Sequence, residues 1–433
     1  PSTIQNNGGT VKADSGGTLD LTNVTIFGGL LTGTGTIATV GNGSESYFDG
    51  TASALSIGSG TTVTVNDQTT LDLTGTITNA GKIDAASGGT IELDGVTIKG
   101  GTLGGTGTIE TKAGSSDSTF DGSGAGGFTI ANGTEITVTA GTKLDLTGTI
   151  YNDAAINVDA NSNPAPAELT ISSSVVLKGY GTITLDPGDS IVSNGTAATL
   201  ENFNNTISGA GAIGNSGDTL LTLKNDAAGI IDANVNGETL TIDTGNTVTN
   251  NGTLEATNGG TLKIVDDVTG SGHAEVSTGG MLDILGSDPQ PVIFNDASTL
   301  KLEATSSFTG DVSGLSVGDI IDLSGITVTS ATFSGSTLTV NGTTATFTIS
   351  GLTSADAFYF TSDGTGGTNF TFETAPTITI GAIAADNVVN SSEAAAGFTI
   401  GGTASDASVD VNGQFITIDI VNASNVVVDT FTT

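Results

Sequence analysis

The chain has 433 residues, of which 45 are acidic and nine are basic, so its formal net charge is −36. All nine basic residues are lysine. A negative field of this size, without arginine, excludes a nucleic-acid-binding role and opposes contact with anionic membranes. The absence of cysteine excludes disulfides and thiolate metal sites. No apolar run reaches the roughly 18 residues that a membrane-spanning helix needs.

The 65 glycines follow no Gly-X-Y period, which excludes collagen, and 36% of the residues are hydrophobic. This composition indicates a folded, β-rich protein rather than a disordered one. The length exceeds that of one ordinary hydrophobic core, so we expect either several domains or one elongated solenoid.

Residues 17–83 and 89–156 are two copies of one unit. Gly17–Leu21 matches Gly89–Leu93 at an offset of 72, and Leu71–Ile77 recurs as Leu144–Ile150 at an offset of 144 − 71 = 73. A third, weaker copy begins near Glu168. A match over some seventy positions indicates internal duplication and a repeat architecture.

Within each copy, aliphatic and polar residues alternate for three to five positions, as in Thr61–Val65, and glycine, asparagine or aspartate then interrupts the pattern. This alternation predicts short, half-buried strands joined by tight corners. No stretch keeps a helical period, so the fold should contain almost no helix.

Short segments with strand-like alternation, such as Thr239–Ile242 and Thr261–Ile264, recur roughly every 8–20 residues without long loops between them. This spacing favours coils that wind round one axis. With about 20 residues per coil and about 4.8 Å per coil, residues 1–305 would form a rod about 70 Å long. Alternate residues face opposite sides of a strand. The leucines and isoleucines at positions 19, 21, 71, 73, 91, 93, 144 and 146 should therefore point inward, and Asp20, Asp72, Glu92 and Asp145 should point outward.

The segment Asn250–Leu262 resembles the repeated coil sequence of large repetitive bacterial surface proteins, namely adhesins and autotransporter-like passengers with β-helical stalks. The resemblance implies a right-handed parallel β-helix and an extracellular or cell-surface location.

The residue pattern changes near Phe308. Phe308–Leu323, together with the aromatic cluster Phe358–Phe360, resembles the β-rich module that closes such stalks in proteins secreted by the type I route. We therefore expect a capping module at residues 306–375. Residues 376–433 resemble the opening of a bacterial Ig-like β-sandwich domain, which would be partial here, and the chain is interpreted as a segment of a larger protein.

One candidate metal site follows from this division. Asp386, Asn390 and Glu393 supply hard oxygen ligands within one short loop between the cap and the Ig-like domain, so this loop is a candidate calcium site. The resemblance also implies calcium at such junctions.

The sequence is also compatible with two other functions. The outward acids Asp20, Asp72, Glu92, Asp145 and Asp283 could serve a polysaccharide-cleaving β-helix enzyme, which needs two carboxyl groups at a defined separation. They follow the strand alternation, however, and nothing nearby in the sequence would raise the pKa of any of them, so a solvated acidic face is the preferred explanation. Repeated Thr-x-Thr raises an ice-binding alternative, although threonine also favours strands.

His273 is the only histidine and cannot form a multi-histidine metal site, and the four tyrosines are too dispersed in the sequence to indicate a carbohydrate platform. The sequence therefore predicts a non-enzymatic, secreted or cell-surface protein, whose rigid β-solenoid stalk serves adhesion or assembles into an extracellular filament. A homo-oligomer through the chain ends and a cell-surface or polysaccharide ligand are the expected partners.

Overall fold

The structure is a computed structural model. It describes residues 2–159, 165–215, 217, 219–303, 307–334, 336–341, 345–350, 357–373, 377–383, 391–396, 399–405, 417–421 and 427–432.

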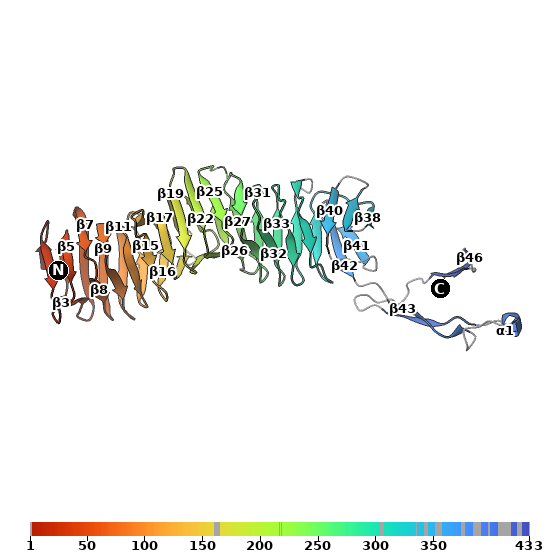
Figure 1. The fold of residues 1–433 in the computed structure, drawn as a ribbon, viewed down its shortest axis with the longest axis horizontal. Helices are drawn as coiled ribbons and strands as arrows, with labels where there is room; N and C mark the ends of the chain where they lie inside the picture. Colours follow the sequence, from red (N-terminus) through yellow and green to blue (C-terminus); the bar gives the residue numbers. More distant parts are fainter. Residues whose placement is uncertain are drawn as a thin grey trace.

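The strands wind into a β-solenoid of about 14 turns (Figure 1). Each coil has three sides, and strands on equivalent sides of successive coils pair in parallel. On the third side, the last coils are joined by an isolated parallel bridge between Asp288 and Phe308. At roughly 4.8 Å per coil, the coils stack into a rod about 67 Å long. The predicted all-β fold with a parallel β-solenoid is confirmed.

The three ladders of parallel strands are called faces A, B and C. Face A contains β1 (Ser2–Gln5), β4 (Val24–Phe27), the first parts of β7 (Ser44–Ile57), β9 (Thr69–Asn79) and β11 (Thr90–Lys99), β13 (Thr108–Thr111), β16 (Glu135–Thr139), β18 (Ala155–Asp159), β20 (Thr182–Leu185), β23 (Thr206–Gly209), β26 (Ile230–Ala233), β29 (Thr253–Ala256), β32 (His273–Val276), β34 (Val292–Phe294) and β36 (Asp311–Ser313).

Face B contains β2 (Thr10–Ala13), β5 (Gly29–Gly33), the second parts of β7, β9 and β11, β14 (Ser118–Gly122), the first parts of β17 (Lys143–Asn152) and β19 (Glu168–Lys178), β21 (Ser190–Ser193), β24 (Gly211–Gly214), β27 (Thr239–Asp243), β30 (Thr261–Ile264), β33 (Met281–Ile284), β35 (Thr299–Leu302) and β37 (Ile320–Leu323).

Face C contains β3 (Thr18–Leu21), β6 (Thr36–Thr39), β8 (Thr62–Val65), β10 (Lys82–Ala85), β12 (Gly101–Gly105), β15 (Phe128–Ile130), the second parts of β17 and β19, β22 (Ala198–Asn202), β25 (Leu221–Asn225), β28 (Val248–Asn250) and β31 (Val268–Thr269). Long strands such as β9 and β17 turn a corner and link neighbouring faces.

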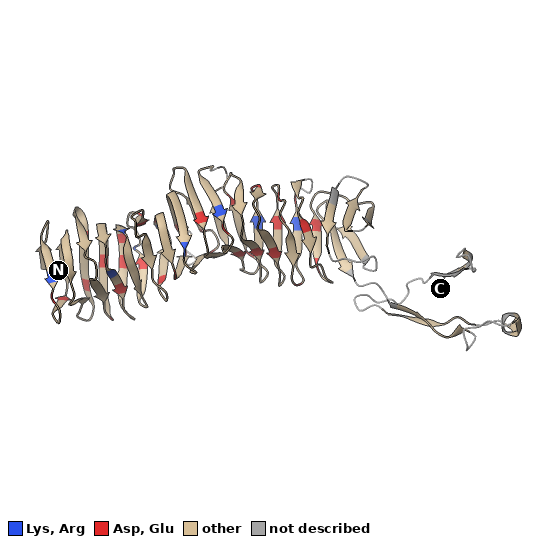
Figure 2. Cartoon of the chain, in the orientation of Figure 1, with Lys and Arg blue, Asp and Glu red and all other residues tan. Residues whose placement is uncertain are grey.

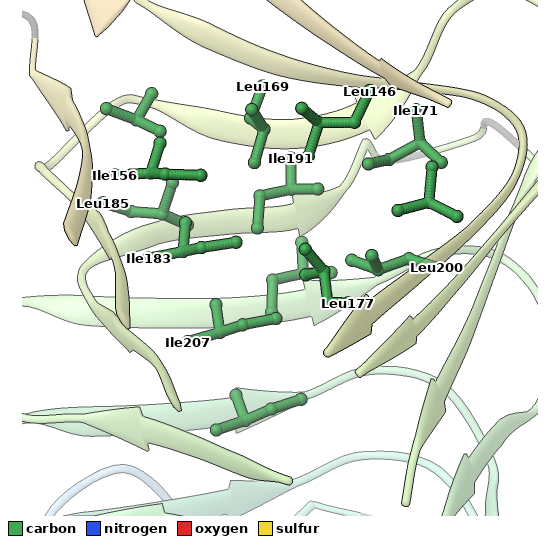
Figure 3. Close-up of a cluster of buried hydrophobic side chains, with 14 of the residues drawn as sticks. Leu146, Ile156, Leu169, Ile171, Leu177, Ile183, Leu185, Ile191, Leu200 and Ile207 are labelled. Atoms are coloured by element: carbon green, nitrogen blue, oxygen red, sulfur yellow. The ribbon is translucent and has the colours of Figure 1, made fainter. Parts of the chain in front are cut away.

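The interior is a continuous stack of aliphatic side chains, as Figure 3 shows for one section. Leu71 of β9 stands in register with Ile91 of β11, and Ile91 with Ile109 of β13. All three are at most 1% exposed. The alternation predicted inward positions correctly for Leu71, Leu73, Leu144 and Leu146, each of which is fully buried. Burial is thus gained coil by coil rather than in one central core.

Buried asparagines recur with the repeat. Asn6, Asn79, Asn152 and Asn225 are spaced by 73 residues, and each is at most 6% exposed. The Nδ2 group of each donates to a backbone carbonyl of the next coil, at 3.2 Å to Gly28, 3.2 Å to Thr102, 3.4 Å to Thr182 and 3.2 Å to Thr253. These amides satisfy carbonyls at the corners, where the strand ladder is interrupted.

The buried amides also bond to one another, beginning with Asn152, which donates to Oδ1 of Asn205 at 2.9 Å. Asn202 donates to Asn225, Asn225 to Asn250, and Asn250 to Gln290, over 2.9, 2.9 and 2.8 Å. The ladder from Asn202 to Gln290 spans five successive coils on the inside of the solenoid, because the bond from Asn250 to Gln290 reaches across the coil of β31. This ladder was not predicted from the sequence.

The sequence repeat does not match a whole number of coils. Gly17–Leu21 contributes β3 of face C, its second copy Gly89–Leu93 contributes to β11 on face A, and the third copy, at Glu168, contributes to β19 on face B. One repeat therefore spans three coils and one further side. Equivalent residues of successive copies lie on different faces of the rod.

Beyond β37 the pairing becomes antiparallel. The strands concerned are β38 (Ala331–Ser334), β39 (Thr337–Val340), β40 (Ala345–Ile349), β41 (Ala357–Ser362) and β42 (Thr368–Glu373). β42 pairs with β37 antiparallel, whereas β40 pairs with β36 in parallel. Phe347, Phe370 and Phe372 of this region are buried and belong to the same hydrophobic cluster as the coils.

The remaining described elements are two antiparallel strand pairs and one short helix. They are β43 (Thr377–Ile380) with β44 (Gly402–Ser405), β45 (Thr417–Val421) with β46 (Val427–Thr432), and α1 (Ser391–Ala396).

Candidate functional site

The outer surface of face A carries one column of residues in register from coil to coil. From β1 to β36 the column reads Thr3, Thr25, Tyr47, Asp72, Glu92, Glu110, Thr137, Asn157, Thr184, Ser208, Asp232, Glu255, Glu275, Ile293 and Ser313. Its six acids form two groups of three on consecutive coils (Figure 2). Carboxylates at the coil spacing repel one another unless a cation lies among them.

Lys112 is the cation of the first group. Its Nζ forms an ion pair with Asp72 and a second one, at 2.8 Å, with Glu92. Oxygens of Glu45, Asp72 and Glu92 lie within 4.8 Å of one another, so these acids could hold a metal ion. The Oδ1 atom of Asp72 is buried and accepts no hydrogen bond.

Asp72 corrects the expectation of a solvated acid. Its side chain lies on the outer side of the strand, as the alternation predicts, but it is only 1% exposed because its neighbours cover it. Burial raises the pKa of Asp72 to about 6, although the ion pair with Lys112 opposes this shift.

Asp145, the copy of Asp72 in the next repeat, is 6% exposed and is also buried rather than solvated. It lies on face B, where it accepts hydrogen bonds from Thr170 at 3.0 Å and Ser172 at 2.9 Å. Burial raises the pKa of this carboxyl, against the effect of these hydroxyls. The same sequence thus has a lysine partner on face A and hydroxyl partners on face B.

The second acidic group consists of Asp232, Glu255 and Glu275. Burial, together with the neighbouring charges of Asp232 and Glu275, raises the pKa of Glu255 to about 7. The only histidine, His273, lies in β32 and contacts Glu275 through Nε2 at 2.9 Å. Thr257 donates to Asp232 at 3.0 Å.

Face B carries charges of alternating sign. Its column contains Lys263, Asp283, Lys301 and Asp322 on four consecutive coils. The alternation reduces the repulsion that face A retains. Asp283, one of the acids considered for catalysis, is 7% exposed and thus buried.

Face C carries exposed aromatic residues. Tyr151 of β17 pairs in register with Lys178 of β19, and Phe203 follows directly after Asn202, which pairs with Leu177. The Nζ of Lys178 lies 6.0 Å from the ring centre of Tyr151 and 5.6 Å from that of Phe203. These three residues are called the aromatic strip. The aromatic strip was not predicted from the sequence, because its members are separated by 27 and 25 residues.

An open groove of about 600 Å³ lies at the corner between faces B and C, on the N-terminal side of the strip. Its walls include Lys99, Thr102, Asp121 and Thr129, and its floor is rich in glycine. Thr102 and Thr129 lie in the same column as Tyr151.

The predicted calcium ligands lie at the edge of the described chain. Asp386 and Asn390 are outside the described residues, and Glu393 falls within α1 but its side chain is not described. Calcium at this junction therefore stays a prediction. Within the described residues, no helix combines the length and the apolar character needed to span a membrane.

No protein-family model, curated protein or solved structure matches this chain. The resemblance to bacterial adhesins and autotransporter-like stalks therefore stays a prediction, and the function has to be argued from the solenoid itself.

Proposed function

We propose that this chain is a non-enzymatic structural protein of the bacterial surface or extracellular space, in which the solenoid acts as a rigid stalk. The observation that carries the proposal is the unbroken stacking of about 14 coils in three parallel ladders. Each coil contacts only its neighbours, so length is gained without a larger core. The net charge of −36 keeps such a rod soluble.

The burial of three of the five outward acids supports a non-enzymatic role, whereas Asp20 is exposed and Glu92 partly exposed. A catalytic carboxyl group must reach its substrate. Asp72 combines a raised pKa with nearby carboxylates, as a glycosidase acid would, yet it is 1% exposed and paired with Lys112. Asp145 and Asp283 are buried as well.

The antiparallel strands β38–β42 suit a capping role at the C-terminal end of the coils. A sheet edge left open by a solenoid invites pairing with other chains, and a cover of antiparallel strands removes that risk. In this proposal residues 306–375 cap the stalk, and residues 376–433 belong to an Ig-like extension that joins it to further domains.

Filament formation is a separate prediction, which electron microscopy of the purified chain with and without calcium would test.

Immunogold electron microscopy on intact producing cells tests the proposed location. An antibody against the solenoid should label the outer surface or the surrounding matrix. Label confined to the cytoplasm in sectioned cells would overturn the proposal.

Incubation with a panel of polysaccharides tests the enzymatic alternative. The wild-type chain should release no new reducing ends. Cleavage that disappears in Asp72→Asn or Glu255→Gln, with folding intact, would establish the alternative instead.

The ice-binding alternative needs a flat threonine array. The outward column of face C instead mixes residue types. Lys82 lies between Thr62 and Thr102, and Tyr151 and Lys178 follow Thr129. This irregularity favours the stalk.

A further inference from the structure

The aromatic strip differs from the rest of the solenoid surface in its composition. Tyr151 is 38% exposed and Phe203 is 45% exposed, whereas most large apolar side chains of the coils are buried. Both rings are on face C, on either side of Lys178, in coils that follow one another directly. Exposed aromatic rings in a row are costly in water and often mark a binding surface.

The lysine of the strip is also distinctive. Seven of the nine lysines form ion pairs with acids of the described chain, at positions 12, 82, 99, 112, 143, 224 and 301. Within the same described residues Lys178 forms none, although the chain has 45 acids. The ammonium group of Lys178, which lies between the two rings, is therefore available to an external anion.

Two of the three nearby acids on the same surface have a lysine partner. Asp121, in the groove, lies 3.8 Å from Lys99, and Glu201, in the column next to the strip, lies 2.8 Å from Lys224. Asp153 lies at the border of the strip, with its Oδ1 close to Gly179. An anion that approaches Lys178 thus meets much less repulsion here than on face A.

The groove and the strip form one linear surface. Thr102, Thr129, Tyr151 and Lys178 occupy successive coils of one column, and Phe203 adjoins Lys178. Gly127 of the groove lies against the ring of Tyr151, since a Cβ at this glycine would come within 2.7 Å of Tyr151 Cε2. At roughly 4.8 Å per coil, the surface extends about 19 Å along the rod.

We propose that the groove and the aromatic strip bind a linear polysaccharide chain that carries carboxylate groups, that is, a polymer rich in uronic acids. The apolar C–H faces of the sugar rings pack on Tyr151 and Phe203. A sugar carboxylate pairs with Lys178, and the hydroxyls of Thr102 and Thr129 form hydrogen bonds with sugar hydroxyls.

Three features favour this occupant. Hydrogens on a sugar face carry partial positive charge and are attracted to the negative faces of aromatic rings. An unpaired ammonium group selects an anion. An extended chain matches the linear surface, whereas a compact ligand would use only one end. The inference adds a ligand to the proposed stalk role, yet the stalk role does not require it.

Isothermal titration calorimetry at physiological ionic strength tests the proposal, since screening then limits the field of distant acids to about 8 Å. The probes are an oligomer of galacturonic acid, a neutral oligomer of glucose, and oligoglutamate of similar charge. The uronate oligomer should bind measurably more tightly than the other two. Tyr151→Ala, Phe203→Ala and Lys178→Met should each weaken its binding at least about tenfold.

Matched controls come from other parts of the chain. Lys263→Met removes the other lysine without an ion pair in the described chain, from face B, and Tyr359→Ala removes an exposed ring of β41. Neither should change binding. Thermal melting establishes that each variant is folded, and Lys178→Gln provides a second test if the methionine variant unfolds.

Several results would overturn the proposal. These are the absence of uronate binding by the folded wild-type chain, equal binding of oligoglutamate or of the neutral oligomer, and loss of binding in the controls but not in the strip variants. Surface labelling of cells would be unaffected by such results, so the stalk proposal is tested separately.

Discussion

At the scale of single residues, Asp72 shows how the fold changes the meaning of a motif. The sequence places it at an outward position, and the structure keeps it there but covers it and pairs it with Lys112. The lysine lies 40 residues further along the chain, so no local pattern around Asp72 could reveal the pair. A position that resembles a catalytic acid is instead a buried ion pair between coils.

The first prediction concerns this ion pair. Lys112→Met leaves Asp72 and Glu92 close together without a cation, so the variant should lose about 1–3 kcal/mol of stability and melt at a lower temperature. The control Lys12→Met removes the exposed pair with Asp14 and should change the midpoint little. Equal effects of the two substitutions in calorimetric melts would count against a special role for Lys112.

The second prediction concerns pH. Burial raises the pKa of Asp72 and of Asp288 to about 6, and burial raises the pKa of Glu255 to about 7. Because the folded chain holds these protons more tightly than the unfolded chain, stability is greatest when they are bound and falls as pH rises from about 4 to about 7. The melting midpoint should therefore be roughly 2–5 °C higher at pH 5 than at pH 8.

Asp288 provides the matched variant for this prediction. Its Oδ1 accepts the backbone N–H of Gln290 at 2.8 Å, while its buried Oδ2 has no hydrogen-bond partner. Asp288→Asn should raise the midpoint at pH 8 and reduce the difference between pH 8 and pH 5. A midpoint that increases with pH in the wild-type chain would contradict the assignment.

At the scale of elements, side-chain hydrogen bonds at the corners join successive coils in addition to the strand ladders. Asn6, Asn79, Asn152 and Asn225 recur at intervals of 73 residues, and each bonds to a carbonyl of the following coil. The amide ladder from Asn202 to Gln290 extends this arrangement inside the C-terminal coils.

The third prediction tests this ladder. Asn225→Ala removes the acceptor of Asn202 and the donor to Asn250, so it should cost about 2 kcal/mol or more. Asn157→Ala removes only an exposed contact with Glu135 and should cost well under 1 kcal/mol. Thermal midpoints of the two variants provide the comparison, and similar losses would show that the buried ladder adds no stability.

The sequence predicted part of this architecture and could not predict the rest. Alternation alone identified Leu71, Leu73 and their copies as interior residues, because strand side chains must face opposite sides. It could not reveal that a repeat ends one side further round the rod, since this depends on the exact length of every coil. Tyr151, Lys178 and Phe203 also come together only because of the exact lengths of the coils between them, and no local sequence pattern links them.

At the scale of the whole molecule, the rotation of successive repeats has a functional consequence. Residues duplicated in sequence, such as Asp72 and Asp145, lie on two different faces and have different partners. The duplication therefore extends the rod without repeating a site along one face. The three faces therefore differ in their surface residues. Face A carries acidic groups, face B carries charges of alternating sign, and face C carries the aromatic strip, with the groove at its corner with face B.

The central claim is that each face consists of parallel strands in register, one coil apart. The chain has no cysteine, so engineered pairs can report this register directly. Thr137 and Asn157 are partners on adjacent coils of face A, whereas Thr184 is one coil beyond Asn157. Adjacent coils place the two Cα atoms about 4.8 Å apart, within the range of a disulfide, and two coils place them about 9.6 Å apart, outside it.

Mass spectrometry of the folded double variants after mild oxidation is the decisive measurement. Thr137→Cys with Asn157→Cys should form an intramolecular disulfide nearly completely, as should Thr249→Cys with Thr269→Cys on face C. Thr137→Cys with Thr184→Cys should remain reduced. A disulfide in the two-coil pair, together with free thiols in the adjacent pairs, would contradict the three-sided solenoid.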